Sequence, residues 1–154
     1  MALLAADLAK VSHDLTAEET RTLQKKITLD IFAGVIFRTP VDEGVARGAW
    51  QISIGNLPSD SVQRVDKTED EFSSPTYLTG LQQLGALDFW DIVFITNNVK
   101  YVLVLDQGLF VPENPGPSKD PRPDRLGEIL VEGGYSVQAP TGMVDVTLES
   151  VRLR

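Results

Sequence analysis

Residues 16–40 read TAEETRTLQKKITLDIFAGVIFRTP, and this stretch decides the fold because it predicts one long helix. Thr16 and Glu19 have the spacing of a capping box, in which each side chain bonds the backbone amide of the other residue. The apolar side chains that recur about every four residues along one face are Leu23, Ile27, Ile31, Phe32, Val35 and Ile36. Pro40 ends the pattern, so we expect an amphipathic helix over about residues 17–38, or 16–39 with its caps.

The segment before this helix, residues 1–15, is expected to be an N-terminal arm. Its apolar start is short, carries no basic leader and is interrupted by Asp7, so we interpret it as the start of a helix or a loose arm and not as a signal peptide. The single histidine of the chain, His13, lies in this arm and is expected at the surface.

Turns and strands are predicted after the helix. Residues 39–44 read as a turn in which Gly44 is free to take a positive φ. A short helical turn over residues 45–50 leads into residues 51–54, where isoleucines alternate with polar side chains as in a half-buried strand. The unbroken β-rich run 91–96 predicts a central strand.

The second half of the chain gives less decisive patterns. Residues 76–87 predict a short helix, whose apolar positions are Leu78, Leu81 and Leu84. Residues 101–106 fit either a strand or a short helix. The tail at residues 143–151 alternates like a strand, although Val144, Leu148 and Val151 also fit a helical stripe, and its β-branched content favours the strand.

Two long polar loops are predicted, at residues 55–76 and 109–126. The first contains the acidic run 66–71, which we expect to be solvated. The second contains five prolines between residues 112 and 123, which exclude regular structure there. A chain of 154 residues supports one hydrophobic core, so residues 1–154 are expected to form a single domain.

Composition excludes several classes of protein. The chain has 14 basic and 22 acidic residues, a net charge of −8, and no third of it is basic, so it lacks the positive surface with which proteins grip nucleic acid. It has no cysteine, which excludes disulfides, thiolate metal sites and a cysteine nucleophile. No apolar run reaches the ~18 residues that a spanning helix needs.

No catalytic constellation stands out in the sequence. The chain contains neither a Gly-x-Ser-x-Gly turn nor a glycine-rich phosphate loop. The acidic residues from Asp60 to Glu71 lack the spacing of a calcium-binding loop. We therefore predict no catalytic residue, metal site or cofactor. Trp50 and Trp90 are expected to be anchors of the core or of an interface, with the core favoured.

Three short segments carry a resemblance to a known family. The first, after the long helix, is Thr39-Pro40-Val41-Asp42-Glu43-Gly44 with Ala46-Arg47-Gly48-Ala49-Trp50. The second is Asn97-Asn98-Val99-Lys100-Tyr101 with Leu105-Asp106-Gln107-Gly108, and the third is Ala139-Pro140-Thr141-Gly142-Met143-Val144. In this order and spacing they resemble the signature of small neck proteins of tailed bacteriophages, called tail-completion, head–tail joining or tail-terminator proteins. Asp106 stands where that family usually has Glu, and Val102 where it prefers Ala.

The resemblance implies an α+β fold, with a small mixed or antiparallel sheet packed against the long helix, and no enzyme activity. It implies a homo-oligomeric ring, commonly of six copies, in the virion neck or tail, assembled in the host cytoplasm without a membrane. The implied partners are the tail-tube protein and head-connector or stopper proteins. DNA would pass through the lumen without tight binding, which the charge of about −48 on six chains of −8 favours.

Contacts between subunits or with partners are expected at the turn after the helix, at the acidic run and at the second segment. The residues predicted for these interfaces are Asp42, Glu43, Arg47, Trp50, Asp66, Glu69, Asp70, Glu71 and Asp106. Arg47 is expected either to form a charged contact, within or between subunits, or to be a solvated side chain.

Alternatives remain open at this point. The sequence does not distinguish a protein that terminates the tail from one that joins the connector or bridges both, nor does it give the number of copies in the ring. A position on the inner-tube or baseplate side of the tail is also compatible with it. A different class is a small metal-dependent hydrolase or nucleotide-handling enzyme that uses exposed carboxylates.

Overall fold

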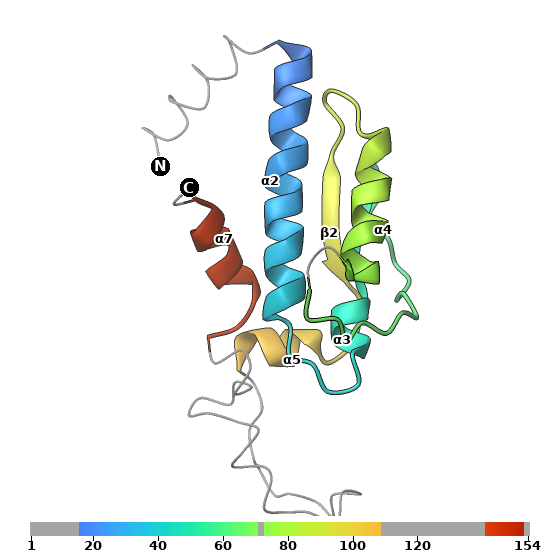
Figure 1. The fold of residues 1–154 in the computed structure, drawn as a ribbon, viewed down its shortest axis with the longest axis vertical. Helices are drawn as coiled ribbons and strands as arrows, with labels where there is room; N and C mark the ends of the chain where they lie inside the picture. The colour runs from blue at the N-terminus through green and yellow to red at the C-terminus, as the bar shows by residue number, and fades with distance from the viewer. Residues whose placement is uncertain (1–15, 71–72, 109–140, 153–154) are drawn as a thin grey trace, which may run out of the picture.

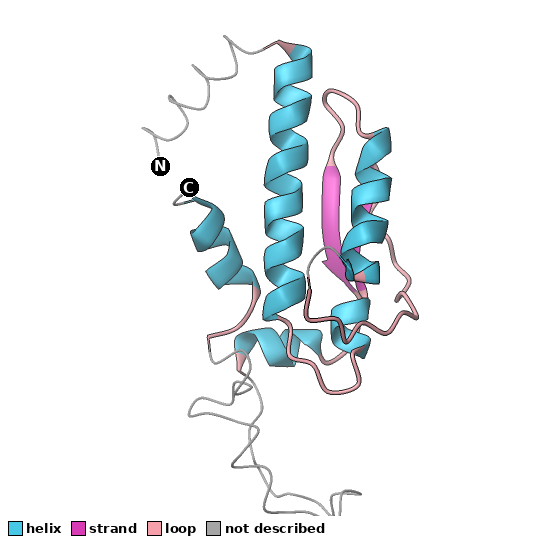
Figure 2. Cartoon of the chain, in the orientation of Figure 1, coloured by secondary structure: helices cyan, strands magenta, loops and turns pink. Residues whose placement is uncertain are grey.

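The computed structural model describes residues 16–70, 73–108 and 141–152 of the chain. Its elements, in chain order, are α2 (Ala17–Arg38), α3 (Val45–Gly48), β1 (Trp50–Ile54), α4 (Pro75–Gln83), the 3-10 helix η2 (Leu84–Ala86), β2 (Val93–Asn97), α5 (Val102–Gln107) and α7 (Val144–Arg152). Helix α2 lies between α7 on one side and the sheet with α4 on the other (Figure 1). Helices packed with one antiparallel pair of strands (Figure 2) confirm the predicted α+β class.

Helix α2 begins and ends where the sequence predicts. The Thr16 amide donates to the Glu19 carboxylate at 2.8 Å, and the Glu19 amide donates to Thr16 Oγ1 at 3.3 Å, so the capping box is formed. At the other end, Thr39 is extended, and its hydroxyl donates to the Val35 carbonyl at 2.6 Å. Pro40 follows directly and prevents the helix from continuing.

The predicted apolar stripe of α2 is only partly buried. Phe32, Val35 and Ile36 form the centre of the core with residues of the sheet and η2. Leu23 and Ile27, in the first half of the helix, are instead 42% and 41% exposed, so the predicted stripe is not buried along its whole length. The described part of α7 packs beside α2 from Arg38 back to about Asp30 and reaches no further, so these two side chains are left uncovered.

The turn after α2 is also as predicted. Gly44 has φ 81°, in the left-handed region that glycine adopts without strain. A Cβ atom there would lie 2.7 Å from the Asp66 carbonyl oxygen, so the site also requires the smallest residue. This turn lets the chain pass from α2 through the single helical turn α3 into β1.

The sheet consists of β1 and β2 in antiparallel register, with Ile52 opposite Ile95. Ile52 is buried, and Val93 and Ile95 pack against the core from β2. The prediction that β2 is a central strand is wrong for the part of the chain that the structure describes, because β1 is its only partner there. Apolar residues on β2 reflect its packing against helices as well as its strand pairing.

Helix α4 turns a different face to the core than the sequence predicts. Its buried residues are Thr76 and Gly80, while Leu78 and Leu81 are exposed. Gly80 faces the ring of Phe32 so closely that a Cβ atom would collide with it. The absence of a side chain at Gly80 therefore sets the packing face of α4, and of the three leucines only Leu84, in η2, is buried.

The C-terminal strand is wrong as a prediction, because residues Val144–Arg152 form the helix α7. The Asp106 carboxylate accepts hydrogen bonds from the amides of Met143 and Val144, both at 2.8 Å, and so caps the start of this helix. Its buried Thr147 packs against Gly34 of α2. Residues 101–106, for which the sequence allowed a strand or a helix, form most of helix α5, and the capping residue Asp106 lies near the end of this helix.

Some predictions lie outside the described residues. They are the N-terminal arm 1–15 with His13, Glu71 and the proline-rich loop 109–126. The other predicted loop, 55–76, contains neither helix nor strand up to residue 70, but it ends earlier than predicted because α4 starts at Pro75.

Candidate functional site

Arg47 is buried inside the chain. It projects from α3, where its Nη1 donates to the Thr68 carbonyl at 2.9 Å and its Nη2 donates to the Thr39 carbonyl at 3.1 Å. Its guanidinium carbon lies 5.7 Å from the centre of the Phe37 ring. Burial lowers the pKa of Arg47, and the negative charges of Asp66 and Glu69 oppose that shift. The alternative of a solvated arginine is therefore wrong, and its hydrogen bonds are intramolecular.

Trp50 anchors the start of β1 to the end of α2. Its indole Nε1 donates to Thr39 Oγ1 at 2.7 Å, and the same hydroxyl donates to the Val35 carbonyl. The side chain is 6% exposed and belongs to the core. The prediction that Trp50 anchors the turn against the long helix is confirmed, and its polar atom is satisfied, as a buried indole requires.

Asp66 is buried, at 1% exposure, which contradicts the prediction of a fully solvated acidic run. Its carboxylate accepts hydrogen bonds from the Ser74 hydroxyl at 2.6 Å, the Thr76 amide at 3.2 Å and the Thr68 amide at 3.0 Å. Burial alone would raise the pKa of Asp66. The hydrogen bonds from Ser74, Thr76 and Thr68 outweigh it and lower the pKa to about 2. This side chain therefore holds the loop before α4 in place.

Arg64 completes this buried polar cluster, and the sequence analysis did not single it out. Its Nη2 donates to the Trp50 carbonyl at 2.8 Å, and its Nε lies 3.0 Å from the Gly48 carbonyl and 3.2 Å from Thr76 Oγ1. Burial lowers the pKa of Arg64, and the Asp66 carboxylate opposes that shift. The available signal was the single arginine of a long loop between two predicted elements.

The eight predicted interface residues that the structure describes, all but Glu71, do not form one site. Asp42 and Glu43 are exposed in the turn after α2, and Glu69 and Asp70 are exposed near the end of the 55–70 loop. Three others, Arg47, Trp50 and Asp66, lie in the buried cluster. Asp106 is engaged in capping α7, where Gly142 has φ 81° and lies so close to the Asp106 carbonyl that a Cβ atom would not fit.

Trp90 is the most exposed large apolar side chain among the described residues, at 83%. Core burial, the favoured prediction for it, is therefore wrong. Its φ is 72°, and Trp90 is the one residue other than glycine with positive φ in the described chain. A bulky side chain in this region costs about 1–3 kcal/mol and persists only where neighbouring contacts enforce it.

Neighbouring contacts do enforce this turn. The Asp88 amide donates to the Asp91 carboxylate at 2.7 Å, and the Asp91 amide donates to the Asp88 carbonyl at 3.2 Å. Two side chains of α2 hold the turn from below: Arg21 pairs with the Asp88 carboxylate at 2.7 Å, and Gln24 donates to the Asp91 carbonyl at 2.9 Å. The turn is therefore a built feature that presents an indole ring to the outside.

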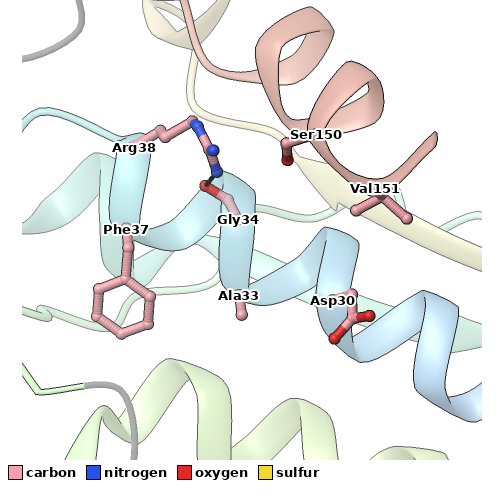
Figure 3. A pocket seen from close by; sticks show the side chains of 7 residues that line it. All are labelled: Asp30, Ala33, Gly34, Phe37, Arg38, Ser150 and Val151. Atoms are coloured by element: carbon pink, nitrogen blue, oxygen red, sulfur yellow. Dashed lines mark hydrogen bonds between the residues drawn. The ribbon is translucent and has the colours of Figure 1, made fainter. Parts of the chain in front are cut away.

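A groove of about 240 Å³ lies between α2 and α7 (Figure 3). Its apolar lining comes from Ala33, Gly34, Phe37 and Val151. Arg38 lies at one end and Asp30 at the other (Figure 3). Arg38 makes long contacts, 3.3 Å to the Gly34 carbonyl and 3.4 Å to Thr147 Oγ1, whereas the Asp30 carboxylate has no ion pair with any described residue. The groove thus combines an apolar floor with one charge of each sign.

The described residues hold neither a cluster of metal ligands nor a membrane-spanning helix. They contain no group of three or more histidine, aspartate and glutamate side chains close enough to hold a metal ion. Among those same residues, no helix combines the length and apolar character needed to cross a membrane.

Comparison with known proteins leaves the family open. No protein-family model, no curated protein and no solved structure matches this chain. The resemblance to phage neck proteins therefore stays a prediction that rests on three short segments of the sequence.

Proposed function

We propose that this chain is a structural protein of the bacteriophage virion neck. Copies of it assemble into a ring, of about six subunits by the family resemblance, at the junction of head and tail. The ring contacts tail-tube and connector proteins and lets DNA pass through its lumen. Its work is to join surfaces, and no covalent bond is made or broken.

One observation carries the proposal: the three segments that carry the resemblance are joined to one another in the fold. The first and second meet where Asn97 Nδ2 donates to the Ala46 carbonyl at 2.7 Å. The second and third meet where Asp106 caps Met143 and Val144. Segments that lie as much as 100 residues apart form one connected scaffold, which supports their being parts of a single signature and not unrelated turns.

Surface composition also supports a role in assembly. Large apolar side chains are exposed on α2, the 55–70 loop, α4, the turn before β2, the start of α5 and α7, and such side chains form protein–protein contact sites where they lie together. The members of this group are Leu23, Ile27, Leu57, Val65, Leu78, Leu81, Trp90, Ile92, Tyr101, Leu103 and Leu148. The acidic net charge of −8 disfavours adhesion to DNA in a lumen.

The test is an amber mutation in the gene for this chain in the phage that encodes it. We expect filled heads and separate tails that fail to join, with joining restored when the purified chain is added to the lysate. Normal infectious particles without the chain would refute the proposal. Turnover of a substrate by the purified chain would favour the enzyme class instead.

A further inference from the structure

The Trp90 turn has the properties of an interface anchor. Its indole ring is exposed and is held out by a hydrogen-bonded turn, and its centre lies 4.6 Å from that of the neighbouring Phe89 ring, with the two planes tilted by 53°. Tryptophan is enriched among the residues that dominate binding energy, because it buries a large apolar area and ends in one hydrogen-bond donor. Ile92, two residues further along the chain, is exposed as well.

The groove between α2 and α7 has the size of one large side chain. A cavity of about 150 Å³ is enough to hold a benzene ring, so the 240 Å³ here has room for the two fused rings of an indole. Drug-sized ligands and cofactors occupy pockets of about 300 Å³ or more. The groove therefore fits a protruding side chain better than a free cofactor.

We propose that the Trp90 side chain of one copy of this chain inserts into the groove between α2 and α7 of the next copy. This inference rests on the proposed function, to which it adds the contact that joins neighbouring subunits.

The chemistry of the two surfaces matches. Ala33, Phe37 and Val151 supply apolar contacts for the ring faces. At the two ends of the groove, the Arg38 guanidinium can stack on an aromatic ring, and the Asp30 carboxylate can accept the indole N–H. The carboxylates that flank Trp90, on Asp88 and Asp91, have charge opposite to that of Arg38.

The contact extends beyond the groove. Successive residues of a helix are rotated by about 100°, which places the exposed Leu23 and Ile27 on the same side of α2 as Gly34 and Arg38. These two side chains continue the apolar surface past the described end of α7. A neighbouring copy seated on the groove would cover them together with its own Ile92.

The two surfaces do not meet within the described part of one chain, because they lie along different halves of α2. The Trp90 turn is held by Arg21 and Gln24 in the first half of the helix, whereas the groove is lined by residues of the second half, from Asp30 to Arg38. A contact between unlike surfaces repeats from copy to copy and closes into a ring when the rotation allows. The geometry thus suits the head-to-tail arrangement that a ring needs.

Two variants test the contact by sedimentation velocity over a concentration series. Trp90→Ala removes the ring, and Ser150→Trp fills the groove with a side chain of its own. Each should weaken self-association by about 30-fold or more, as expected for loss of a dominant anchor. The matched controls are Gln82→Ala, an exposed residue on α4, and Glu149→Trp, on the exposed side of α7, and both should associate like the wild type.

A mixture of the two variants gives the sharpest outcome. The Ser150→Trp chain keeps its Trp90, and the Trp90→Ala chain keeps an open groove, so an equimolar mixture has one functional contact. We expect dimers of one copy of each and nothing larger. If Ser150→Trp does not fold by circular dichroism, Arg38→Glu replaces it as the groove variant.

Three results would overturn the inference: a wild-type chain that stays monomeric, a Trp90→Ala chain that associates like the wild type, or a mixture that stays monomeric. The second and third results are distinct from failure of the proposed function, whereas a monomeric wild-type chain counts against the proposed ring as well. A virion that joins head and tail without the protein refutes the neck role, whereas a Trp90→Ala chain that still forms rings refutes only this contact.

Discussion

The two tryptophans of this chain have opposite surroundings. Trp50 is buried at the start of β1, with its indole N–H bonded to Thr39. Trp90 is 83% exposed at the far end of the molecule, on a turn with positive φ. The turn before β2 and helix α5 lie at opposite ends of α2 (Figure 1), so Trp90 is remote from the motif residues that surround Trp50.

The difference shows how one residue type serves two purposes. Around Trp50, the chain supplies a hydroxyl for the indole and apolar neighbours for the ring, so the side chain contributes to the fold. Around Trp90, the hydrogen bonds are made by Asp88, Asp91, Arg21 and Gln24, and they fix the backbone and leave the ring outside. The first surroundings stabilise the fold of one chain, and the second hold an exposed ring in place, which the proposed contact with a neighbouring copy would use.

The largest expected effect is on the buried tryptophan. Trp50→Ala should lower the free energy of unfolding by about 3–5 kcal/mol, because it leaves a cavity and removes the hydrogen bond that the Thr39 hydroxyl oxygen accepts from the indole. Trp90→Ala, with an exposed ring, should change it by no more than about 0.5 kcal/mol. Urea unfolding followed by circular dichroism measures both. Equal losses would show that the two tryptophans do not differ as described.

The next largest effect on stability is expected at Asp66, which holds the loop between β1 and α4 in place. Its folded pKa of about 2 lies below the unfolded value of 3.8, so the ionised form stabilises the fold above about pH 4. This stability is lost as the pH falls toward 2. Asp66→Asn should therefore cost about 2 kcal/mol at pH 7 and flatten the pH dependence of unfolding between pH 4 and 2.

Exposed Asp60→Asn, in the same loop, is the control for Asp66→Asn and should leave both the stability at pH 7 and the acid profile unchanged. A wild-type protein whose stability does not vary between pH 4 and 2 would contradict the assigned hydrogen bonds of Asp66.

A smaller effect is expected where Asp106 caps α7. Asp106→Ala should cost about 1 kcal/mol, the usual loss for a helix cap, and should raise hydrogen exchange in α7 more than in α2. Asp145→Ala, an exposed acidic residue in the first turn of α7, is the control. Uniform exchange across both helices after Asp106→Ala would argue against a local cap.

The smallest effect, with the opposite sign, is expected at Trp90. Glycine adopts positive φ freely, so Trp90→Gly should relieve backbone strain and leave the melting temperature unchanged or raised by a few degrees, while self-association is lost. A lower melting temperature would mean that the exposed ring contributes to the monomer, which would end the contrast with Trp50.

Local sequence rules predicted the elements whose determinants are close together in the chain. The capping box, Pro40 and the turn at Gly44 fix α2 and its exit from within a few residues. The prediction of a strand for residues 143–151 was wrong. The β-branched residues of this segment favour a strand, whereas the cap that starts helix α7 comes from Asp106, 37 residues before Met143. No local pattern carries that information.

The predictions for several individual side chains were wrong for the same reason. An acidic run is usually solvated, but Asp66 finds its donors on Ser74 and Thr76, in the next element. Leu78 and Leu81 have helical spacing, but Gly80 lets Phe32 approach and turns them outward. Trp90 shows no sequence signal of exposure, because its position depends on Arg21 and Gln24 of α2. In each case a distant partner decides the outcome.

The mass of the wild-type chain in solution tests the central claim most directly, since the claim is that copies of this protein join to one another. Native mass spectrometry together with sedimentation over a concentration series should show one closed oligomer of defined stoichiometry, in equilibrium with the monomer. A monomer at every concentration, or a series of aggregates with no preferred size, would contradict the account.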